Sequence, residues 1–529
     1  MSRASRHFSW RGWLIAALLL AAPHGHAAQP NSSTLRIALA SDLRGTNPGV
    51  NRDSVTDWVT IHIVEPLLAI DGSLKPAPML AQSWTVSADG REYRFRLRPG
   101  VKFHNGDVLR AQHVVWSWKR LLDPKTRWPC RPWFDGSGDA GIHIETIDAP
   151  DAMTVRFQLA EPNALFLYRL ADIQCSAAIL HPDSVDAQGK WRWPIGTGPY
   201  RLSEWQRGRY IRLDRFADYS PASGPPSGLA GRKQALLQTL RFVVIPDPSA
   251  IKLAMLSGEI DVWPVATTAE SLPELRRDGQ LRLLDEQSRD WSVLLMQNRN
   301  GVMRNPALRA AIASVLDPAM ITNSTLHAER PPRPYAIPAS DIDPEILARI
   351  PPAYQPLRTQ DLLQEAGYHG ELIEIDVARE LTNYFNDAIV IHALLTRAGI
   401  NARVRSMDWP TQFKRYWQGE YQLSVFGYTG RAAAPMMYSV FVCDPLKHAD
   451  CVVHTPRSFD VLREMSNSSS SDSWPKLAGL LEEEIARDRS IVGLYAPLRM
   501  TTLRRDVHGY ETWAMGLPRF WGVSLEAAQ

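Results

Sequence analysis

Long apolar runs, catalytic motifs and a large net charge are all missing from this chain of 529 residues. Its N-terminal apolar run covers residues 13–22, about half of the roughly 20 residues that a helix needs to cross a bilayer. No later run reaches that length. If the protein takes part in moving a solute across a membrane, other chains must therefore form the passage.

Catalytic motifs are equally scarce. No G-x-S-x-G, H-E-x-x-H, Walker loop or nucleotide-binding G-x-G-x-x-G occurs in a suitable strand and helix context. The turn at 196–200, Gly-Thr-Gly-Pro-Tyr, lacks both the Walker spacing and a following Lys-Ser/Thr, so we interpret it as structural. Scattered Ser, His and Asp residues could still assemble a triad in space. The sequence favours a binding protein over an enzyme, and it predicts no cofactor.

The charge balance is close to even, with 59 basic and 56 acidic residues and a formal net charge of +3. Arg3, Arg6 and Arg11 have no acidic counterpart in the first 27 residues, so the rest of the chain has a net charge of about zero (+3 minus 3). Such a balance gives no reason to expect a nucleic-acid partner.

The N-terminus has the three regions of a secretory signal peptide. The three arginines precede the apolar run 13–22, and Gly25-His-Ala27 supplies small residues for cleavage. The sequence therefore predicts a signal peptide at 1–27. No cysteine directly follows the apolar run to accept a lipid, and an uncleaved anchor would be too short to span a membrane. We expect an exported protein that is free in the periplasm.

Cysteine is rare: the chain has four cysteines. In an oxidising compartment these could form two disulfides in three alternative pairings. The four are Cys130, Cys175, Cys443 and Cys451. We favour Cys443 with Cys451, which closes a short local loop, and Cys130 with Cys175, which lie within one expected lobe. Both pairs are predicted as disulfides.

A metal site is the alternative use of the second pair. Cys443, His448, Cys451 and His454 form the pattern C-x4-H-x2-C-x2-H, and cysteine and histidine are zinc ligands. Oxidised sulfur is a poor zinc ligand. The exported setting therefore favours the disulfide, and we predict no bound metal.

The most informative stretch is residues 81–124. Two strand-like runs, 84–86 and 93–97, flank an Ala-Asp-Gly turn, which is a strong hairpin signal. A Gly-punctuated loop follows, and then apolar residues recur at helical spacing before Asp123-Pro124. The expected buried stripe of this helix consists of Val114, Val115, Trp118, Leu121 and Leu122.

With its surroundings, this block resembles the signature region of the family 5 extracellular solute-binding proteins, the oligopeptide- and dipeptide-binding receptors of bacterial ABC importers. Further similar segments follow in order along the chain: Glu-Pro-Leu-Leu at 65–68, the turn at 196–200, and the stretches 256–262, 308–317 and 362–368.

The length predicts two or three lobes, and the resemblance implies an α/β periplasmic-binding-protein clamp. Two lobes would be joined by a hinge, with an extra family-type domain and a discontinuous first lobe. The expected parts are the signal peptide (1–27), the first lobe (33–70, 196–295 and 493–529), the extra domain (71–195) and the second lobe (296–492). Lobes joined by several chain crossings can close on a ligand.

The ligand is expected in the crevice between the lobes. In peptide-binding members the segment matching 427–431 looks like Gly-Trp-x-x-Asp, whose carboxylate pairs with the peptide's α-ammonium group. Here Tyr428 takes the aromatic position and Arg431 the acidic one. Two roles are open for Arg431: it holds a carboxylate or phosphate instead, or it points to solvent or pairs internally. Asp408 and Trp409 are interpreted as structural. The ligand-binding candidates are Tyr428, Arg431, Gly427, Trp128, Trp133 and Arg379. For Trp128 and Trp133 the alternative is that they cover a loop beneath the Cys130 crosslink.

The resemblance implies a monomeric receptor that captures a peptide or peptide-like small polar solute and delivers it to an ABC permease and ATPase in the membrane. A receptor for a metal chelate or haem on the same fold is the alternative, and a hydrolytic enzyme is the least favoured.

Overall fold

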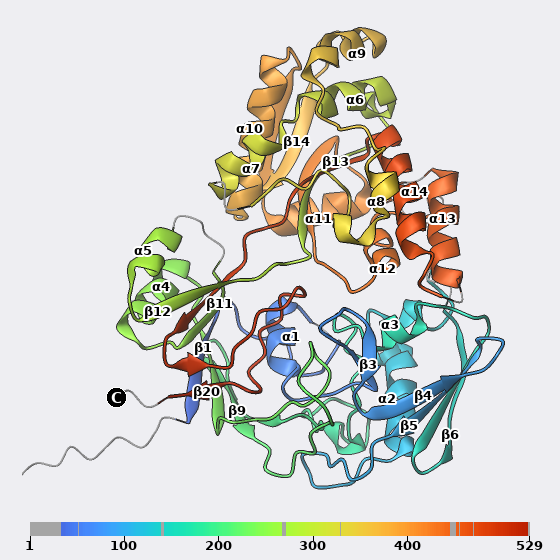
Figure 1. The fold of residues 1–529 in the computed structure, drawn as a ribbon, viewed down its shortest axis with the longest axis vertical. Coiled ribbons are helices and arrows are strands. Elements are labelled where there is room, and N and C mark those ends of the chain that lie inside the picture. Colours follow the sequence, from blue (N-terminus) through green and yellow to red (C-terminus); the bar gives the residue numbers. More distant parts are fainter. Residues whose placement is uncertain are drawn as a thin grey trace, which may run out of the picture.

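Three sheets organise the chain in the computed structural model, which describes residues 33–50, 52–138, 142–266, 271–327, 330–444, 451–453, 455–468 and 470–526. The predicted signal peptide, 1–27, lies outside these residues. The second lobe stands above the first lobe and the extra domain, which lie side by side (Figure 1). Within the described part of the chain, no helix is long and apolar enough to cross a membrane.

The first lobe is built on a seven-stranded sheet in the order β12-β18-β11-β1-β10-β9-β8. β1 lies inside the sheet and runs parallel to β10 and β11, and its Leu35, Ile37 and Leu39 are fully buried. The strands come from three separate stretches of chain, so this lobe is discontinuous. They are β1 (Thr34–Leu39), β8 (Tyr200–Gln206), β9 (Tyr210–Arg215), β10 (Thr239–Val244), β11 (Val262–Ala266), β12 (Leu281–Asp285) and β18 (Met500–Arg504).

Short elements complete this lobe and its border with the extra domain. They are α1 (Ser54–Thr60), β2 (Leu68–Ile70), β3 (Pro76–Pro78), α4 (Pro248–Ser257), α5 (Leu272–Arg277), β19 (Val507–His508) and β20 (Ser524–Leu525).

The extra domain contains the predicted hairpin and helix. β4 (Ala81–Val86) and β5 (Glu92–Leu97) pair antiparallel, and β7 (Thr154–Leu159) and β6 (Ile144–Asp151) complete a four-stranded sheet. α2 (Ala111–Leu122) packs on this sheet and ends at Asp123, as predicted. Val114, Trp118 and Leu121 of its apolar stripe are buried, while Val115 and Leu122 are partly buried against the same core. α3 (Phe166–Leu170) follows β7.

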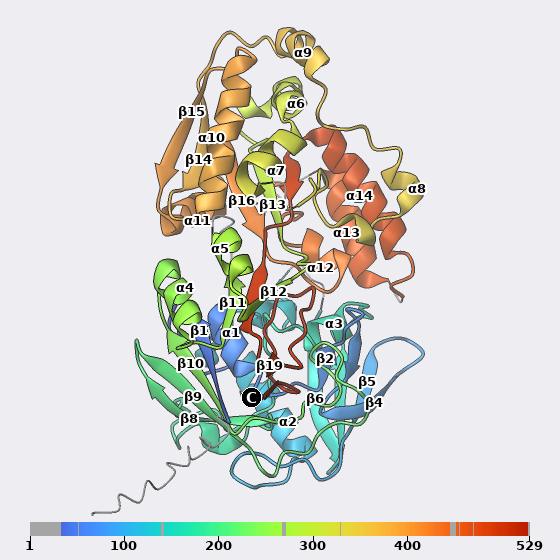
Figure 2. The ribbon, with the colours of Figure 1, turned by 60° about the vertical axis from the view of Figure 1, so that its left-hand side comes forward.

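The second lobe has a five-stranded sheet in the order β15-β14-β16-β13-β17. α10 lies along β14 and β15, while α13 and α14 pair on the other side of the lobe (Figure 2). Its strands are β13 (Trp291–Met296), β14 (Ile373–Ala378), β15 (Ala402–Met407), β16 (Leu423–Tyr428) and β17 (Ile491–Tyr495). Its helices are α6 (Pro306–Val315), α7 (Pro318–Leu326), α8 (Pro344–Leu347), α9 (Thr359–Glu365), α10 (Thr382–Arg397), α11 (Trp409–Gln418), α12 (Ala434–Tyr438), α13 (Pro456–Asn467) and α14 (Trp474–Asp488).

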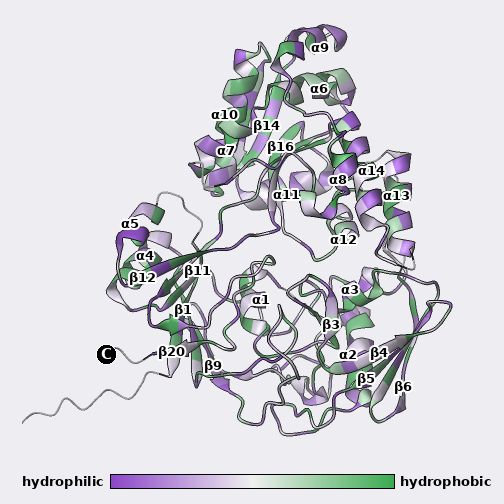
Figure 3. Ribbon diagram, viewed as in Figure 1, coloured by the Kyte–Doolittle hydropathy of each residue, from purple (hydrophilic) through white to green (hydrophobic). Residues whose placement is uncertain are grey.

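The helices of the second lobe alternate hydrophobic and hydrophilic residues along their length (Figure 3). In α10, Ala388, Ile391 and Leu395 are fully buried, whereas Ile389 is 47% exposed. This is the pattern of a helix that covers a sheet with one face and meets solvent with the other.

Two expected lobe boundaries need correction. β13 pairs with β16 and β17 of the second lobe, so the chain leaves the first lobe at 286–290 and not after residue 295. β17 also belongs to the second lobe, and β18 lies in the first, so the return occurs at 496–499 and not after residue 492. An apolar run fits either sheet, which is why sequence periodicity did not place these strands.

The disulfide pairing matches the one favoured from the sequence. Cys130 is bonded to Cys175 across 45 residues, and this bond links the loop after α2 to the loop after α3. Cys443 is bonded to Cys451 across 8 residues. A disulfide restricts the unfolded chain more when it closes a longer loop.

Removing the long-range disulfide should therefore destabilise the protein more than removing the short one. Chain entropy gives a loss of about 4 kcal/mol in unfolding free energy for Cys130→Ala with Cys175→Ala. It gives about 2.5 kcal/mol for Cys443→Ala with Cys451→Ala. Urea denaturation of the two double variants under oxidising conditions measures both losses. An equal or reversed order would contradict the prediction.

Candidate ligand-binding site between the lobes

A cavity of about 720 Å³ lies where the first lobe, the extra domain and the second lobe meet. Its lower side comes from the start of α1, the loop after α2, and α3 with the loop that follows it. Its upper side comes from α11, β16 and the chain beyond β16. α1 and α3 face α11 and α12 across the junction of the two halves (Figure 1).

One side of the cavity is an aromatic wall of six residues. These are Trp409, Phe413, Tyr416 and Trp417 of α11, and Phe426 and Tyr428 of β16. The Tyr416 and Phe426 rings stack with centroids 4.6 Å apart, and the Trp409 ring lies 5.3 Å from that of Phe426. Phe413 is 39% exposed and Trp417 is 51% exposed. Such rings offer a flat apolar surface to a ligand.

Local sequence fixes α11 in this place. The Asp408 side chain accepts the backbone N–H of Thr411 and caps the helix start, and Gly419 ends the helix in the left-handed conformation. The spacing of Trp409, Phe413 and Tyr416 puts three rings on one face, because residues three and four apart are neighbours on a helix.

Arginines also line the cavity, and Arg169 of α3, on its lower side, is the most deeply buried of them. The side chain is 1% exposed, and its guanidinium lies 3.8 Å from the centre of the Trp133 ring. Nη2 donates to Ser439 Oγ at 3.3 Å. Among the described residues, Nε and Nη1 have no hydrogen-bond partner. Burial lowers the pKa of Arg169 to about 10, so the group stays charged at neutral pH.

Arg431 is a second lining cation, and it lies on the upper side, just beyond β16. Its Nη1 donates to the Thr429 carbonyl at 3.0 Å, and its Nε has no hydrogen-bond partner in the described part of the chain. Burial lowers the pKa of Arg431, and the negative charge of Asp172 opposes that shift. The positive charge of Arg431 in turn lowers the pKa of Arg169, so the two guanidinium groups act on each other.

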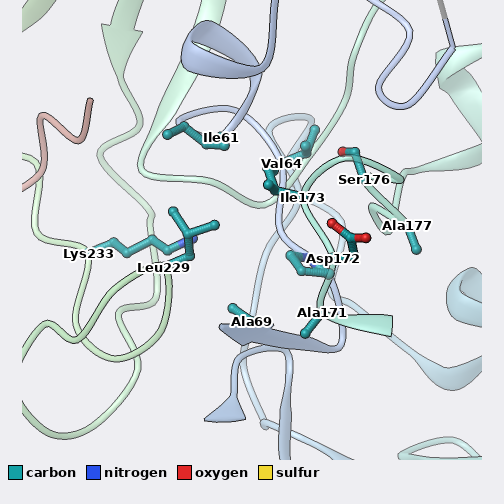
Figure 4. Close-up of a pocket in the computed structure, with 11 residues that line it drawn as sticks. Ile61, Val64, Ala69, Ala171, Asp172, Ile173, Ser176, Ala177, Leu229 and Lys233 are labelled. Carbon is teal, nitrogen blue, oxygen red and sulfur yellow. The ribbon is translucent and has the colours of Figure 1, made fainter. Parts of the chain in front are cut away.

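Asp172 is the carboxylate behind these two cations. It is 5% exposed, its Oδ1 accepts the Gln174 backbone N–H at 2.9 Å, and its Oδ2 lies 3.8 Å from Arg169 Nη1. The carboxylate borders a separate cavity of about 20 Å³, with Lys233 on the far side (Figure 4). Lys233 has its own partner, Glu65, at 3.8 Å. One carboxylate, that of Asp172, therefore neutralises part of the charge of both arginines. The pair of arginines keeps an excess of positive charge.

The loop that carries Arg431 is tied to the crossing segment 286–290. The Gly430 backbone N–H donates to Asp290 Oδ1 at 2.7 Å, and Arg289 Nε donates to the Arg431 carbonyl at 3.0 Å. Asp290 also lies 3.3 Å from Arg499 of the second crossing segment. A Cβ at Gly430 would lie 2.5 Å from the Arg289 Cβ and 2.8 Å from its carbonyl carbon. Glycine is required here because the two backbones approach too closely for a side chain.

Four of the six sequence candidates line the cavity, and two do not. The four are Tyr428, Gly427, Arg431 and Trp133. Trp128 is instead 2% exposed, stacks on Phe134, and donates from Nε1 to the Cys175 carbonyl. It belongs to the core of the extra domain, because its ring fills space beside the disulfide. Arg379 is exposed after β14 and is not among the lining residues.

The sequence analysis missed Arg169 and most of the aromatic wall. A lone arginine inside the apolar run of α3 was the available signal for Arg169. For the wall, the signal was four aromatic residues at helical spacing in an otherwise polar helix. Asp408 is structural, as interpreted, whereas Trp409 lines the cavity.

The alternative metal pattern lies only partly within the described chain. Cys443 and Cys451 are bonded to each other, and His448 and His454 lie outside the described residues. Among the residues that are described, no group of three or more His, Cys, Asp or Glu side chains could hold a metal ion.

Known proteins resemble this chain over most of its length. The di/tripeptide-binding protein 4 of Pseudomonas aeruginosa is 30% identical over 389 residues, covering 69% of this chain and 70% of that protein. The probable ABC transporter periplasmic-binding protein SapA of Escherichia coli is 24% identical over 542 residues, covering 97% and 96%.

A solved structure has the same fold. It is the ABC transporter-associated periplasmic binding protein DppA from Helicobacter pylori in complex with the peptide STSA, with a TM-score of 0.77 and 24% identity. The match covers 94% of this chain and 98% of that one. The family model for the middle region of the bacterial extracellular solute-binding proteins, family 5, matches residues 75–446. The chain belongs to this family of extracellular solute-binding proteins.

Proposed function

We propose that this protein is the solute-binding component of an ABC importer. It captures a peptide or peptide-like small polar solute between its lobes and delivers it to a membrane permease with its ATPase. The observation that carries the proposal is the cavity of about 720 Å³ whose lining comes from both lobes and the extra domain. Ligand pockets of this size form preferentially at such domain junctions.

Two crossing segments give the clamp a hinge. The Glu286 backbone N–H donates to the Arg499 carbonyl at 2.9 Å, which joins the segments 286–290 and 496–499 as one ribbon. Rotation about this ribbon moves the second lobe toward the first. A solute that contacts both lobes binds the closed form better than the open form, so it shifts the population toward closure. The permease would recognise this closed conformation.

The cavity chemistry supports binding over catalysis. Within the described residues, no histidine lines the cavity. The Ser439 hydroxyl donates to the Met436 carbonyl and accepts from Arg169, so its proton is bonded to a backbone carbonyl and not to a general base. These features support the assignment of the chain as a receptor. It acts as a monomer in the periplasm, the compartment named for its relative SapA.

The purified mature chain, 28–529, should bind short peptides and close around them. Ligand at 100 times Kd adds about 2.7 kcal/mol of stability, which raises the melting temperature by several degrees. Calorimetric titration with a pool of di- to tetrapeptides measures binding, and small-angle X-ray scattering measures the expected fall in the radius of gyration. A chain that keeps no peptide and does not contract is not a peptide receptor.

Gly430→Ala should weaken solute binding by about tenfold or more while the chain stays folded. The added methyl group meets the Arg289 backbone, and overpacking of this kind costs about 1–3 kcal/mol, which displaces the loop that carries Arg431. Gly45→Ala is the matched control, because no atom lies within 4 Å of its Cβ position. Titration of both variants tests the prediction, and equal affinities would refute the role of this loop.

A further inference from the structure

We infer that the captured solute is an acidic molecule with a flat apolar group, held by its anion between Arg169 and Arg431 and needing no free ammonium group. This inference rests on the proposed function, because it names the class of solute that the same cavity accepts. Four features of the cavity carry it: the two arginines, the way neighbouring charges are paired, the position of the one lining carboxylate, and the aromatic wall.

The arginines are built to receive acceptors. Arg169 is 1% exposed, yet its Nε and Nη1 have no hydrogen-bond partner among the described residues. The Nε of Arg431 is also buried and has no hydrogen-bond partner among these residues. Leaving charged donors unmatched out of water is costly. Guanidinium groups match carboxylate and phosphate in a planar, two-point geometry. An anion that lies against both side chains satisfies donors that this part of the chain leaves open.

The neighbouring cations already have partners, so they do not compete for the anion. Arg52 Nε donates to Asp57 Oδ2 at 2.8 Å. Arg463 lines the cavity but is 62% exposed and pairs with Asp460 at 3.0 Å. Asp172 is the carboxylate that Arg169 and Arg431 share. The unbalanced charge is thus concentrated at these two side chains, where a ligand anion neutralises it.

A ligand ammonium group finds no equivalent anchor. Asp53 is the one carboxylate among the described lining residues. Its Oδ1 accepts the Thr56 backbone N–H at 2.8 Å and caps α1. An ammonium group placed near Arg169 and Arg431 would be repelled by both. The site therefore selects for negative charge and against a free amine close to it.

The aromatic wall supplies the second half of the recognition. Its rings line the same cavity as the arginines, and Phe413 and Trp417 present exposed faces. Covering these faces with another ring or a flat aliphatic group removes apolar surface from water. A small polar anion alone would leave the wall uncovered. The two arginines and the aromatic wall together specify an amphipathic acid.

The test uses five synthetic probes that differ in charge or in apolar groups. They are N-acetyl-diphenylalanine, its C-terminal amide, diphenylalanine amide, unblocked diphenylalanine and N-acetyl-diglycine. Calorimetry with the mature chain should show the acetylated acid binding about 10- to 150-fold more tightly than its amide, the range expected for a charged hydrogen-bonded contact. The acetylated acid should bind at least as well as the unblocked dipeptide. N-acetyl-diglycine should bind weakly.

Variants assign the preference to the two arginines. Arg169→Gln and Arg431→Gln should each remove most of the preference for acid over amide, while Arg463→Gln, an exposed arginine of the same cavity, should change affinity by no more than about twofold. Circular dichroism checks that each variant is folded. The comparison of acid with amide in the unaltered chain needs no variant, so it stands even if Arg169→Gln does not fold.

The outcomes separate this inference from the proposed function. Equal binding of acid and amide, or tighter binding of the unblocked dipeptide than of the acetylated acid, overturns the inference while leaving a peptide receptor. Unchanged acid preference in folded Arg169→Gln and Arg431→Gln also overturns it. If neither these probes nor the peptide pool binds, the proposed function fails as well.

Discussion

The rest of the structure depends on the contacts between the two segments that connect the lobes, 286–290 and 496–499. Glu286 is 1% exposed at this point, and its carboxylate accepts the Thr501 hydroxyl at 2.6 Å. Burial raises the pKa of Glu286, because the charged form loses its water. In the same segment, Asp290 forms an ion pair with Arg499 of the other segment and accepts the backbone N–H of Gly430. The relative position of the lobes and the placement of Arg431 therefore have one common support.

This arrangement links recognition to movement. The backbone of the loop that carries Arg431 is bonded to the segment 286–290 through Gly430 and Arg289, so a ligand bound at Arg431 would act directly on a segment that joins the lobes. The other cation, Arg169, belongs to the extra domain, which lies beside the first lobe (Figure 1). Occupying both arginines at once brings together parts of the chain that are 262 positions apart (431 minus 169). In such a receptor, the bonds from the ligand to Arg169 and Arg431 would contribute both to affinity and to the stability of the closed form.

Much of the fold could be predicted from the sequence, because its signals are local. The Asp-Gly turn and the alternation of Tyr93, Phe95 and Leu97 specified the hairpin of the extra domain, and all three side chains are buried. The site was only partly predictable. β13 is buried along its whole length, so its sequence does not reveal which lobe it joins. Arg169 lines the cavity because α3 packs near Ser439, a contact between segments that no local pattern links. Trp128 failed as a candidate because its neighbours in space, not in sequence, place it in the core.

The disulfide between Cys443 and Cys451 has a consequence for how the protein is best produced. Cys443 lines the cavity, and Val442 and Val453, just outside the bonded pair, form a β-bridge. The covalent bond therefore holds a lining residue beside this bridge. Disulfides persist in oxidising compartments and are kept reduced in the cytosol. Protein made in a reducing cytosol would therefore lack this covalent support of the cavity wall.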